Sequence, residues 1–112
     1  MSAAIDDALW SAIGDPTRRR ILDLLLTDGA STATVLSQHL PVSRQAIAKH
    51  IGVLGGAGLV KGYAVGRERR YDVDQEQLAR AVADLASVQA MWDARLSRIK
   101  TLAEAIEKKR NL

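Results

Sequence analysis

The first 58 residues contain four short stretches in which apolar residues recur three or four positions apart. This spacing places the apolar side chains of each stretch on one face of a helix, so the pattern predicts four short helices. The positions expected to be buried are Leu9, Ala12 and Ile13, then Ile21, Leu22, Leu25 and Leu26, then Val35, Leu36 and Leu40, and finally Ile47, Ile51 and Leu54.

Capping residues mark where these helices begin and end. Small polar side chains accept hydrogen bonds from the first free N–H groups of a helix, and glycine suits the left-handed position after its last turn. The third and fourth helices are joined by only a few residues, which is typical of a helix-turn-helix, and residues 43–57 form its second helix. The expected caps are Asp15 before Pro16, Ser31-Thr32, Ser43, and Gly58 at a helix end.

Residues 59–73 have the pattern of a β-hairpin. Residues 59–64 and 69–73 are expected to be strands, and residues 65–68 the turn between them. A hairpin that directly follows a helix-turn-helix is a wing. The expected fold is therefore mainly α with a small β-hairpin, a winged helix-turn-helix.

Residues 75–112 contain neither glycine nor proline, and Asp74 can cap a long helix there. Apolar residues follow one another in alternating steps of four and three, which is typical of a helix that pairs with a second helix. The segment is predicted to be one helix, or two with a kink near Ser87, and packing on its own domain alone is the other interpretation. The residues expected in a dimer interface are Leu78, Val82, Leu85, Trp92, Leu96, Ile99 and Ile106, with Trp10.

The length of 112 residues fits a single domain, 1–112, with a DNA-binding core over 8–74 and a C-terminal dimerisation part over 75–112. A core of this size is marginal alone, which favours a homodimer. The chain has no cysteine, no apolar run long enough for a bilayer and no signal-peptide pattern over residues 1–7, so a cytoplasmic protein without a membrane partner is expected.

Positive charge is concentrated between residues 43 and 70, where six basic residues face one acidic residue, although the whole chain carries only +3. A local basic surface on a recognition helix and a wing points to double-stranded DNA, and a merely solvated face is the alternative. Alternation puts Arg67 and Arg69 on one face of the hairpin and Arg70 on the other. The expected DNA contacts are Ser43, Arg44, Gln45, Ala48, Lys49, His50, Arg67, Arg69, Arg70 and Arg18.

The sequence shows no arrangement typical of catalysis. No nucleophile with a nearby base, paired acid or glycine-rich phosphate loop stands out, so an enzyme is not expected, and neither a cofactor nor a metal site is predicted. For His50, a phosphate contact and a structural hydrogen bond are both open. His39 stands alone at a helix end and is expected to be a capping or surface residue.

Several motifs resemble the ArsR/SmtB family of bacterial winged-helix repressors. They are Asp15-Pro16-Thr17-Arg18, Ile21-Leu22, the run from Leu40 to Ile51, Ala57-Gly58-Leu59-Val60, and the turn from Gly66 to Tyr71. The resemblance covers roughly residues 8–75. It implies a homodimer with paired terminal helices that binds an inverted-repeat operator and represses a nearby operon. It also implies DNA contacts at Ser43, Arg44, Gln45, Lys49 and His50, with wing contacts from Arg67 and Arg69.

The chain also departs from the family pattern. Ala48 stands where the family usually has a serine, and Gly52 and Gly55 weaken the recognition helix. The cysteine pair of the third helix is missing, and residues 75–112 contain no histidine, so metal sensing is not carried over. The resemblance is therefore to the subgroup that lacks the metal-binding motifs.

Three alternatives stay open from the sequence. A winged helix can serve as a protein-interaction module, because the fold does not fix the function. A metal-responsive repressor with an unrecognised site is the second. The third is a regulator that responds to a small-molecule effector, which a dimer-interface pocket around Met91 and Trp92 could hold. The simpler interpretation is that side chains fill that space.

Overall fold

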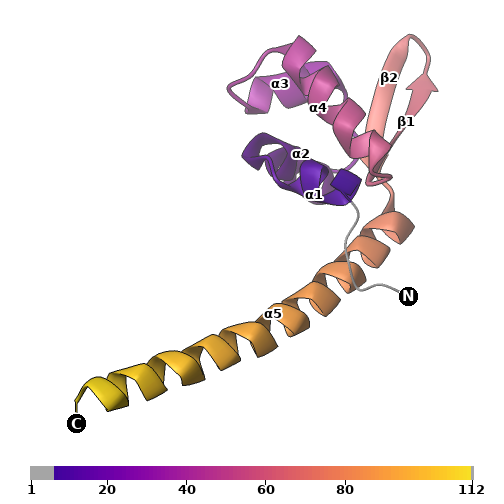
Figure 1. Ribbon diagram of the computed structural model, residues 1–112. Coiled ribbons are helices and arrows are strands. Elements are labelled where there is room, and N and C mark those ends of the chain that lie inside the picture. Colours follow the sequence, from indigo (N-terminus) through magenta and orange to yellow (C-terminus); the bar gives the residue numbers. More distant parts are fainter. Residues whose placement is uncertain (1–6, 112) are drawn as a thin grey trace. The chain divides into compact units, whose positions relative to one another are not determined.

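The computed structural model describes residues 7–111, and its elements form a winged helix-turn-helix with a long last helix, as the sequence predicts (Figure 1). The segment 1–6, where most of the signal-peptide question falls, and Leu112 lie outside the described residues. The elements are α1 (Asp7–Ile13), α2 (Pro16–Asp28), α3 (Ala33–His39), α4 (Arg44–Gly56), β1 (Val60–Val65), β2 (Glu68–Val73) and α5 (Gln75–Arg110).

Two compact units divide the chain. Among the described residues, one comprises residues 7–81 and the other residues 82–111. The sequence places the boundary between 74 and 75, but the first turns of α5 belong with the winged-helix unit, where Ala81 is buried. Gln77, on the first turn of α5, lies against Gly58. A Cβ added to Gly58 would be 3.7 Å from Cγ of Gln77.

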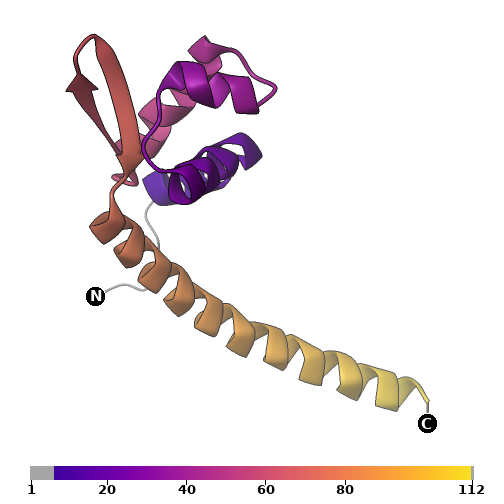
Figure 2. The same cartoon turned by 180° about the vertical axis from the view of Figure 1, so that it is seen from behind.

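The core of the winged-helix unit is built from aliphatic side chains of α1, α2, α3 and α4 and from the base of the hairpin. Figures 1 and 2 show α1 and α2 side by side, α3 and α4 together, and the hairpin beside α4. The side chains that are most completely buried are Ile21, Leu25, Ile47, Leu54 and Leu59.

Each predicted cap forms. Asp15 accepts hydrogen bonds from the N–H groups of Thr17 and Arg18 at 2.8 and 3.1 Å. Gly58, at φ 78°, ends α4 in a left-handed conformation, and Leu59 N–H donates back to the Leu54 carbonyl at 3.0 Å. The other predicted caps that the structure confirms are Thr32, Ser43 and Asp74.

Two core predictions are wrong. Leu26 is 56% exposed, because α2 turns Leu25 inward and Leu26 outward. Val35 is 44% exposed, because it lies at the rim of a surface cleft. Ile13 and Leu40 are only half-buried.

The hairpin is tighter than predicted, because its loop consists of Gly66 and Arg67 alone. Gly66 has a φ of 61°, whereas Arg67 has a negative φ, since every positive φ among residues 7–111 belongs to a glycine. A positive φ at the first of two loop residues only is the geometry of a type II′ turn. Arg67 therefore lies in the turn itself, where strand alternation does not apply, but Arg67 and Arg69 line the same surface cleft.

The last helix is one uninterrupted helix, Gln75–Arg110, so the alternative of a kink near Ser87 is excluded. None of the helices among the described residues combines the length and the apolar character that crossing a bilayer requires.

Candidate nucleic-acid interface

The second helix of the helix-turn-helix, α4, has one buried and one exposed face. Ile47, Ile51 and Leu54 are buried and hold the helix against the core. The opposite face is exposed, as predicted, and presents Ser43, Arg44, Gln45, Ala48, Lys49 and Gly52. Polar, basic and small side chains thus share the surface that a ligand can reach.

The start of α4 can also hold an anion. Ser43 Oγ accepts the N–H of Ala46 at 3.1 Å, which leaves the hydroxyl hydrogen free to donate. The first N–H groups of the helix and its dipole favour a negative charge at this end.

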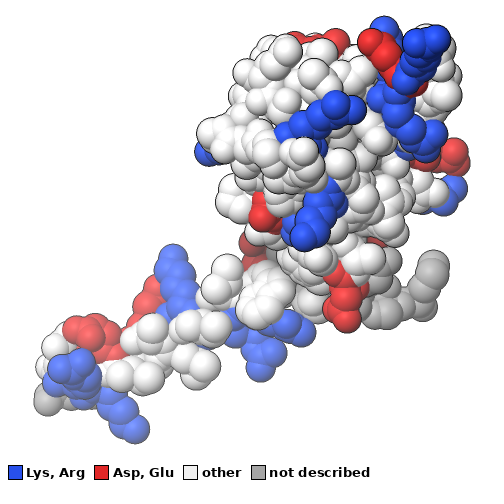
Figure 3. Space-filling model, turned by 90° about the horizontal axis from the view of Figure 1, so that it is seen from above, with Lys and Arg blue, Asp and Glu red and all other residues white. Residues whose placement is uncertain are grey.

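A cleft of about 400 Å³ lies between α3, α4 and the wing. Figure 3 looks onto this side of the winged-helix unit, where Lys and Arg side chains gather at the wing and on the helical surface beside it. Three arginines and one glutamate carry the charge of its walls. The lining residues are Thr32, Ala33, Thr34, Val35, Arg44, Ala48, Arg67, Glu68, Arg69 and Tyr71.

The base of the wing is tied to the start of α3. Ser31 and Tyr71 exchange two backbone hydrogen bonds, of 2.9 and 2.8 Å, as an isolated antiparallel bridge. This bridge fixes β2 relative to the helix-turn-helix. Sequence reasoning missed Thr32, Thr34 and Tyr71 as cleft residues, although a first helix that crosses the DNA backbone is a known docking mode of this motif.

Arg70 lies on the other face of the hairpin from Arg69, as alternation predicts. Its Nη2 atom is 3.5 Å from the Glu68 carboxylate, and both side chains are exposed. Arg70 is not among the residues that line the cleft, although its partner Glu68 is.

Arg18 and His50 are engaged inside the protein. The Arg18 guanidinium donates to the carbonyls of Ser11 and Ala12 at the end of α1 and to His50 Nδ1, 3.2 Å away on α4. A guanidinium can only donate, so His50 accepts through Nδ1. This arrangement favours the structural alternative for His50, and it leaves Arg18 out of the interface that we propose below.

The N-cap carboxylate Asp15 belongs to the same cluster. The backbone N–H of Arg18 holds the pKa of Asp15 below its ordinary value, with smaller contributions from the Thr17 N–H and the charge of Arg18, while partial burial opposes the shift. These hydrogen bonds therefore favour the carboxylate form of Asp15, the form that caps α2.

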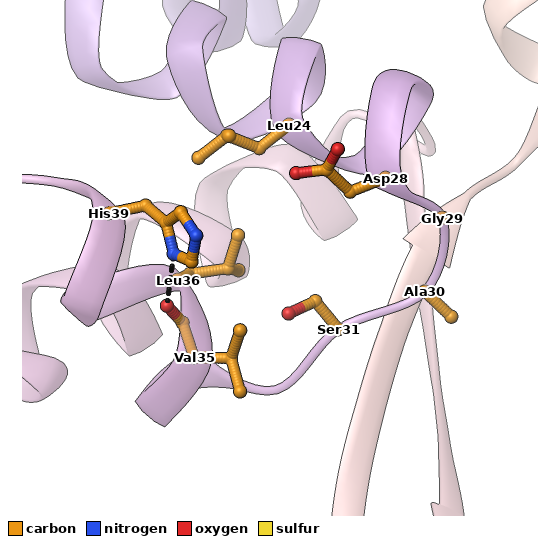
Figure 4. Close-up of a pocket in the computed structure, with 8 residues that line it drawn as sticks. All are labelled: Leu24, Asp28, Gly29, Ala30, Ser31, Val35, Leu36 and His39. Atoms are coloured by element: carbon orange, nitrogen blue, oxygen red, sulfur yellow. Dashed lines mark hydrogen bonds between the residues drawn. The ribbon is translucent and has the colours of Figure 1, made fainter.

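A second hollow, of about 140 Å³, lies between the end of α2 and α3 (Figure 4). Asp28, Ser31 and His39 surround it together with apolar side chains. His39 Nδ1 donates to the Val35 carbonyl at 3.1 Å, which agrees with a capping or surface residue. No group of three or more His, Cys, Asp or Glu side chains among residues 7–111 is placed to hold a metal ion.

Comparison with known proteins places this geometry in a family. A model of a helix-turn-helix domain matches residues 13–63. The HTH-type transcriptional regulator CmtR of Mycobacterium tuberculosis is 41% identical over 80 residues, which cover 71% of this chain and 67% of CmtR. The transcriptional repressor SdpR of Bacillus subtilis is 35% identical over 66 residues, 59% of this chain and 72% of SdpR.

Solved structures agree. An ArsR-like transcriptional regulator from Rhodococcus sp. RHA1 superposes with a TM-score of 0.65 and 42% identity, over 86% of this chain and 90% of that one. The relatives are transcriptional regulators, and the resemblance noted from the sequence is confirmed. The chain belongs to the ArsR/SmtB family of winged helix-turn-helix proteins and is a DNA-binding transcriptional regulator.

Proposed function

We propose that this chain is a homodimeric repressor that binds an inverted-repeat operator, with α4 in the major groove and the wing beside it. The name of the relative SdpR, a transcriptional repressor, supports repression. The proposal includes a cytoplasmic protein without catalytic activity, whose partners are double-stranded DNA and a second copy of the chain.

The observation that carries the proposal is the exposed face of α4 beside the basic cleft. The major groove of DNA admits one helix, and arginine and glutamine are the side chains that fork onto guanine and adenine. Arg44 and Gln45 are exposed in the first turn, and Ala48 is small enough to let the helix approach the bases. Lys49 and Ser43 are placed at the edge of the same surface, where they suit phosphates.

Dimerisation supplies the symmetry that an inverted repeat needs. The second unit of the chain leaves a row of large apolar side chains exposed along α5, which is unusual for a monomer. Two recognition helices held by such a dimer would read half-sites about one helical turn apart. The exposed side chains are Val82, Trp92, Leu96, Ile99, Leu102 and Ile106, and Trp10 on α1 is also exposed.

The test is a selection of bound fragments from random or genomic DNA, followed by anisotropy titrations with the selected duplex. We expect an inverted repeat and a binding constant that falls steeply with salt, because phosphate contacts release counterions. Arg44→Ala should lower the preference for the selected site over random DNA by about tenfold, because one bidentate contact to a base contributes discrimination of that order. Arg67→Ala should instead weaken both duplexes alike.

The matched control is Arg80→Ala, which removes one positive charge from an exposed α5 residue that pairs with Glu76 at 3.0 Å. It should bind both duplexes like the unmodified chain. Micromolar binding without any sequence preference would overturn the specific-repressor proposal.

A further inference from the structure

Arg69 and Gly62 meet on the inner face of the wing. The register pairs Gly62 with Tyr71 and Ala64 with Arg69. Side chains alternate along a strand, so Arg69, Tyr71 and Val73 share one face of β2. Val73 is buried and both Arg69 and Tyr71 line the cleft, so this face is turned toward the helices.

The guanidinium of Arg69 occupies the space that a side chain at position 62 would fill. A Cβ on Gly62 would lie 3.0 Å from Nη2 and 3.1 Å from Nε of Arg69, and 3.1 Å from Cε1 of Tyr71. Arg69's own cross-strand partner is Ala64, which is nearer the turn. The Arg69 side chain therefore reaches back along β1, away from the tip of the wing and toward its base.

This position directs a cation into the cleft before any ligand is bound. Arg44 and Arg69 both line the cleft, one from α4 and the other from the wing. The Arg69 guanidinium lies against Gly62 beside Tyr71 although the residue is exposed, and a side chain that already adopts its binding position loses less rotamer freedom on binding. A pair of guanidiniums from two walls suits a phosphate oxygen well.

We infer that Gly62 is a positioning residue, whose missing side chain lets Arg69 lie along the wing and point into the cleft to bind a backbone phosphate of DNA. The inference rests on the proposed function, because it names the DNA group that this part of the site takes. Arg67 lies in the turn and Arg70 lies on the opposite face of β2 from Arg69, so neither side chain is placed to lie against Gly62.

The first experiment is a double-variant cycle, read out by salt-dependent titration of a random-sequence duplex of about 30 base pairs, because phosphate contacts do not depend on sequence. We expect Arg69→Ala to weaken binding by about tenfold and to lower the slope of log affinity against log salt by about one. Gly62→Val should do the same, since its branched side chain suits a strand but takes the space of the guanidinium.

The decisive result is the double variant. With both changes present, binding should equal that of Arg69→Ala alone, because the two substitutions remove one and the same contact. Tyr63→Val is the matched control, since Tyr63 is the next residue on β1, is exposed and lies on the opposite face with Arg70. It should leave both the affinity and the salt slope unchanged.

A second measurement needs no DNA. Nuclear Overhauser contacts between the Arg69 side chain and the Gly62 α protons are expected in the free protein, and they should disappear in Gly62→Ala. That milder variant adds one methyl group, which requires only small shifts of the Arg69 guanidinium and of the Tyr71 ring, so it should fold, and it should weaken binding by about threefold. It replaces Gly62→Val in the cycle should the latter unfold.

The outcomes separate the two claims. Three results would overturn the positioning role alone. The Gly62 variants could bind with the affinity and salt slope of the unmodified chain, the two effects could add fully in the double variant, or the Overhauser contacts could be absent. An unmodified chain that binds no duplex would overturn the proposed function, and the phosphate contact with it.

Discussion

At the scale of single residues, Arg18 is the side chain whose surroundings explain most. The last carbonyls of a helix have no partner within the helix. Arg18 bonds two of them at the end of α1, and Arg19 bonds a third, the Ile13 carbonyl, at 2.6 Å. The contact with His50 extends this cap to α4. Arg18 thereby joins three helices, α1, α2 and α4, through one guanidinium.

Arg18→Met should therefore lower the stability of the winged-helix unit without removing a DNA contact. Methionine keeps the apolar stem but leaves the carbonyls and His50 without their donor, at a cost of about 2 kcal/mol. Urea denaturation checks the stability, and the salt slope of DNA binding should not change. Arg20→Met, on an exposed neighbour, should cost less than about 0.5 kcal/mol. A loss of one in the salt slope with Arg18→Met would return this residue to the interface.

At the scale of elements, local chemistry could be predicted from the sequence and long-range contacts could not. The caps Asp15, Ser43 and Gly58 follow from residues within one turn, and the structure confirms each of them. The contact of Arg18 with His50 joins positions 32 apart, and no sequence period announces it. Tyr71 likewise looks like an ordinary strand residue until the fold pairs it with Ser31.

The exposed face of α4 was predictable because the apolar period fixes which side is buried. The cleft beside it was not, because it depends on where the wing folds back and on a seven-residue α3 that buries Leu36 but exposes Val35. A short helix has too few turns for its apolar pattern to define a face reliably. Predictions of the site residues on α4 and the wing remain predictions until DNA binding is measured.

The recognition helix carries a local weakness that can be tested. Gly52 lies exposed in the middle of α4, and a Cβ there would meet no atom within 4 Å. Gly52→Ala should therefore raise the free energy of unfolding by about 0.5–1 kcal/mol, because glycine is the poorer helix former. The same methyl should weaken operator binding, since it thickens the face that enters the groove. Urea denaturation and anisotropy titration measure the two effects.

Gly56→Ala is the control for this change. Gly56 is also exposed, with open space around its Cα, but it is the last residue of α4. Replacing it with alanine therefore stabilises the helix less than the same change at Gly52. It should leave operator affinity unchanged. Tighter or equal operator binding by Gly52→Ala would show that α4 does not approach the bases closely.

At the scale of the whole molecule, the exposed face of α5 suggests how two copies pair. The heptad pattern puts Leu96 and Ile99 in the seam, with Trp92 one layer before them and Ala103 one layer after. In a parallel pair, Arg95 would flank Lys100 of the partner subunit, and like charges repel. In an antiparallel pair centred between residues 97 and 98, the large Trp92 faces the small Ala103 of the partner subunit, and Asp93 flanks Lys100 of the partner subunit.

We expect the antiparallel pair, and Ile99→Asp should break it, because a carboxylate cannot be buried in an apolar seam without a partner. Thr101→Asp, on the outer face, should leave the dimer intact in analytical ultracentrifugation. The chain has no cysteine, so single spin labels at Thr101→Cys and Lys108→Cys report the direction. At about 1.5 Å per residue, the axial separation between labels should grow from about 10 Å at position 101 to about 30 Å at position 108. Equal separations at both positions would mean a parallel pair and would contradict the antiparallel arrangement, although a parallel pair is also two-fold symmetric and compatible with an inverted repeat.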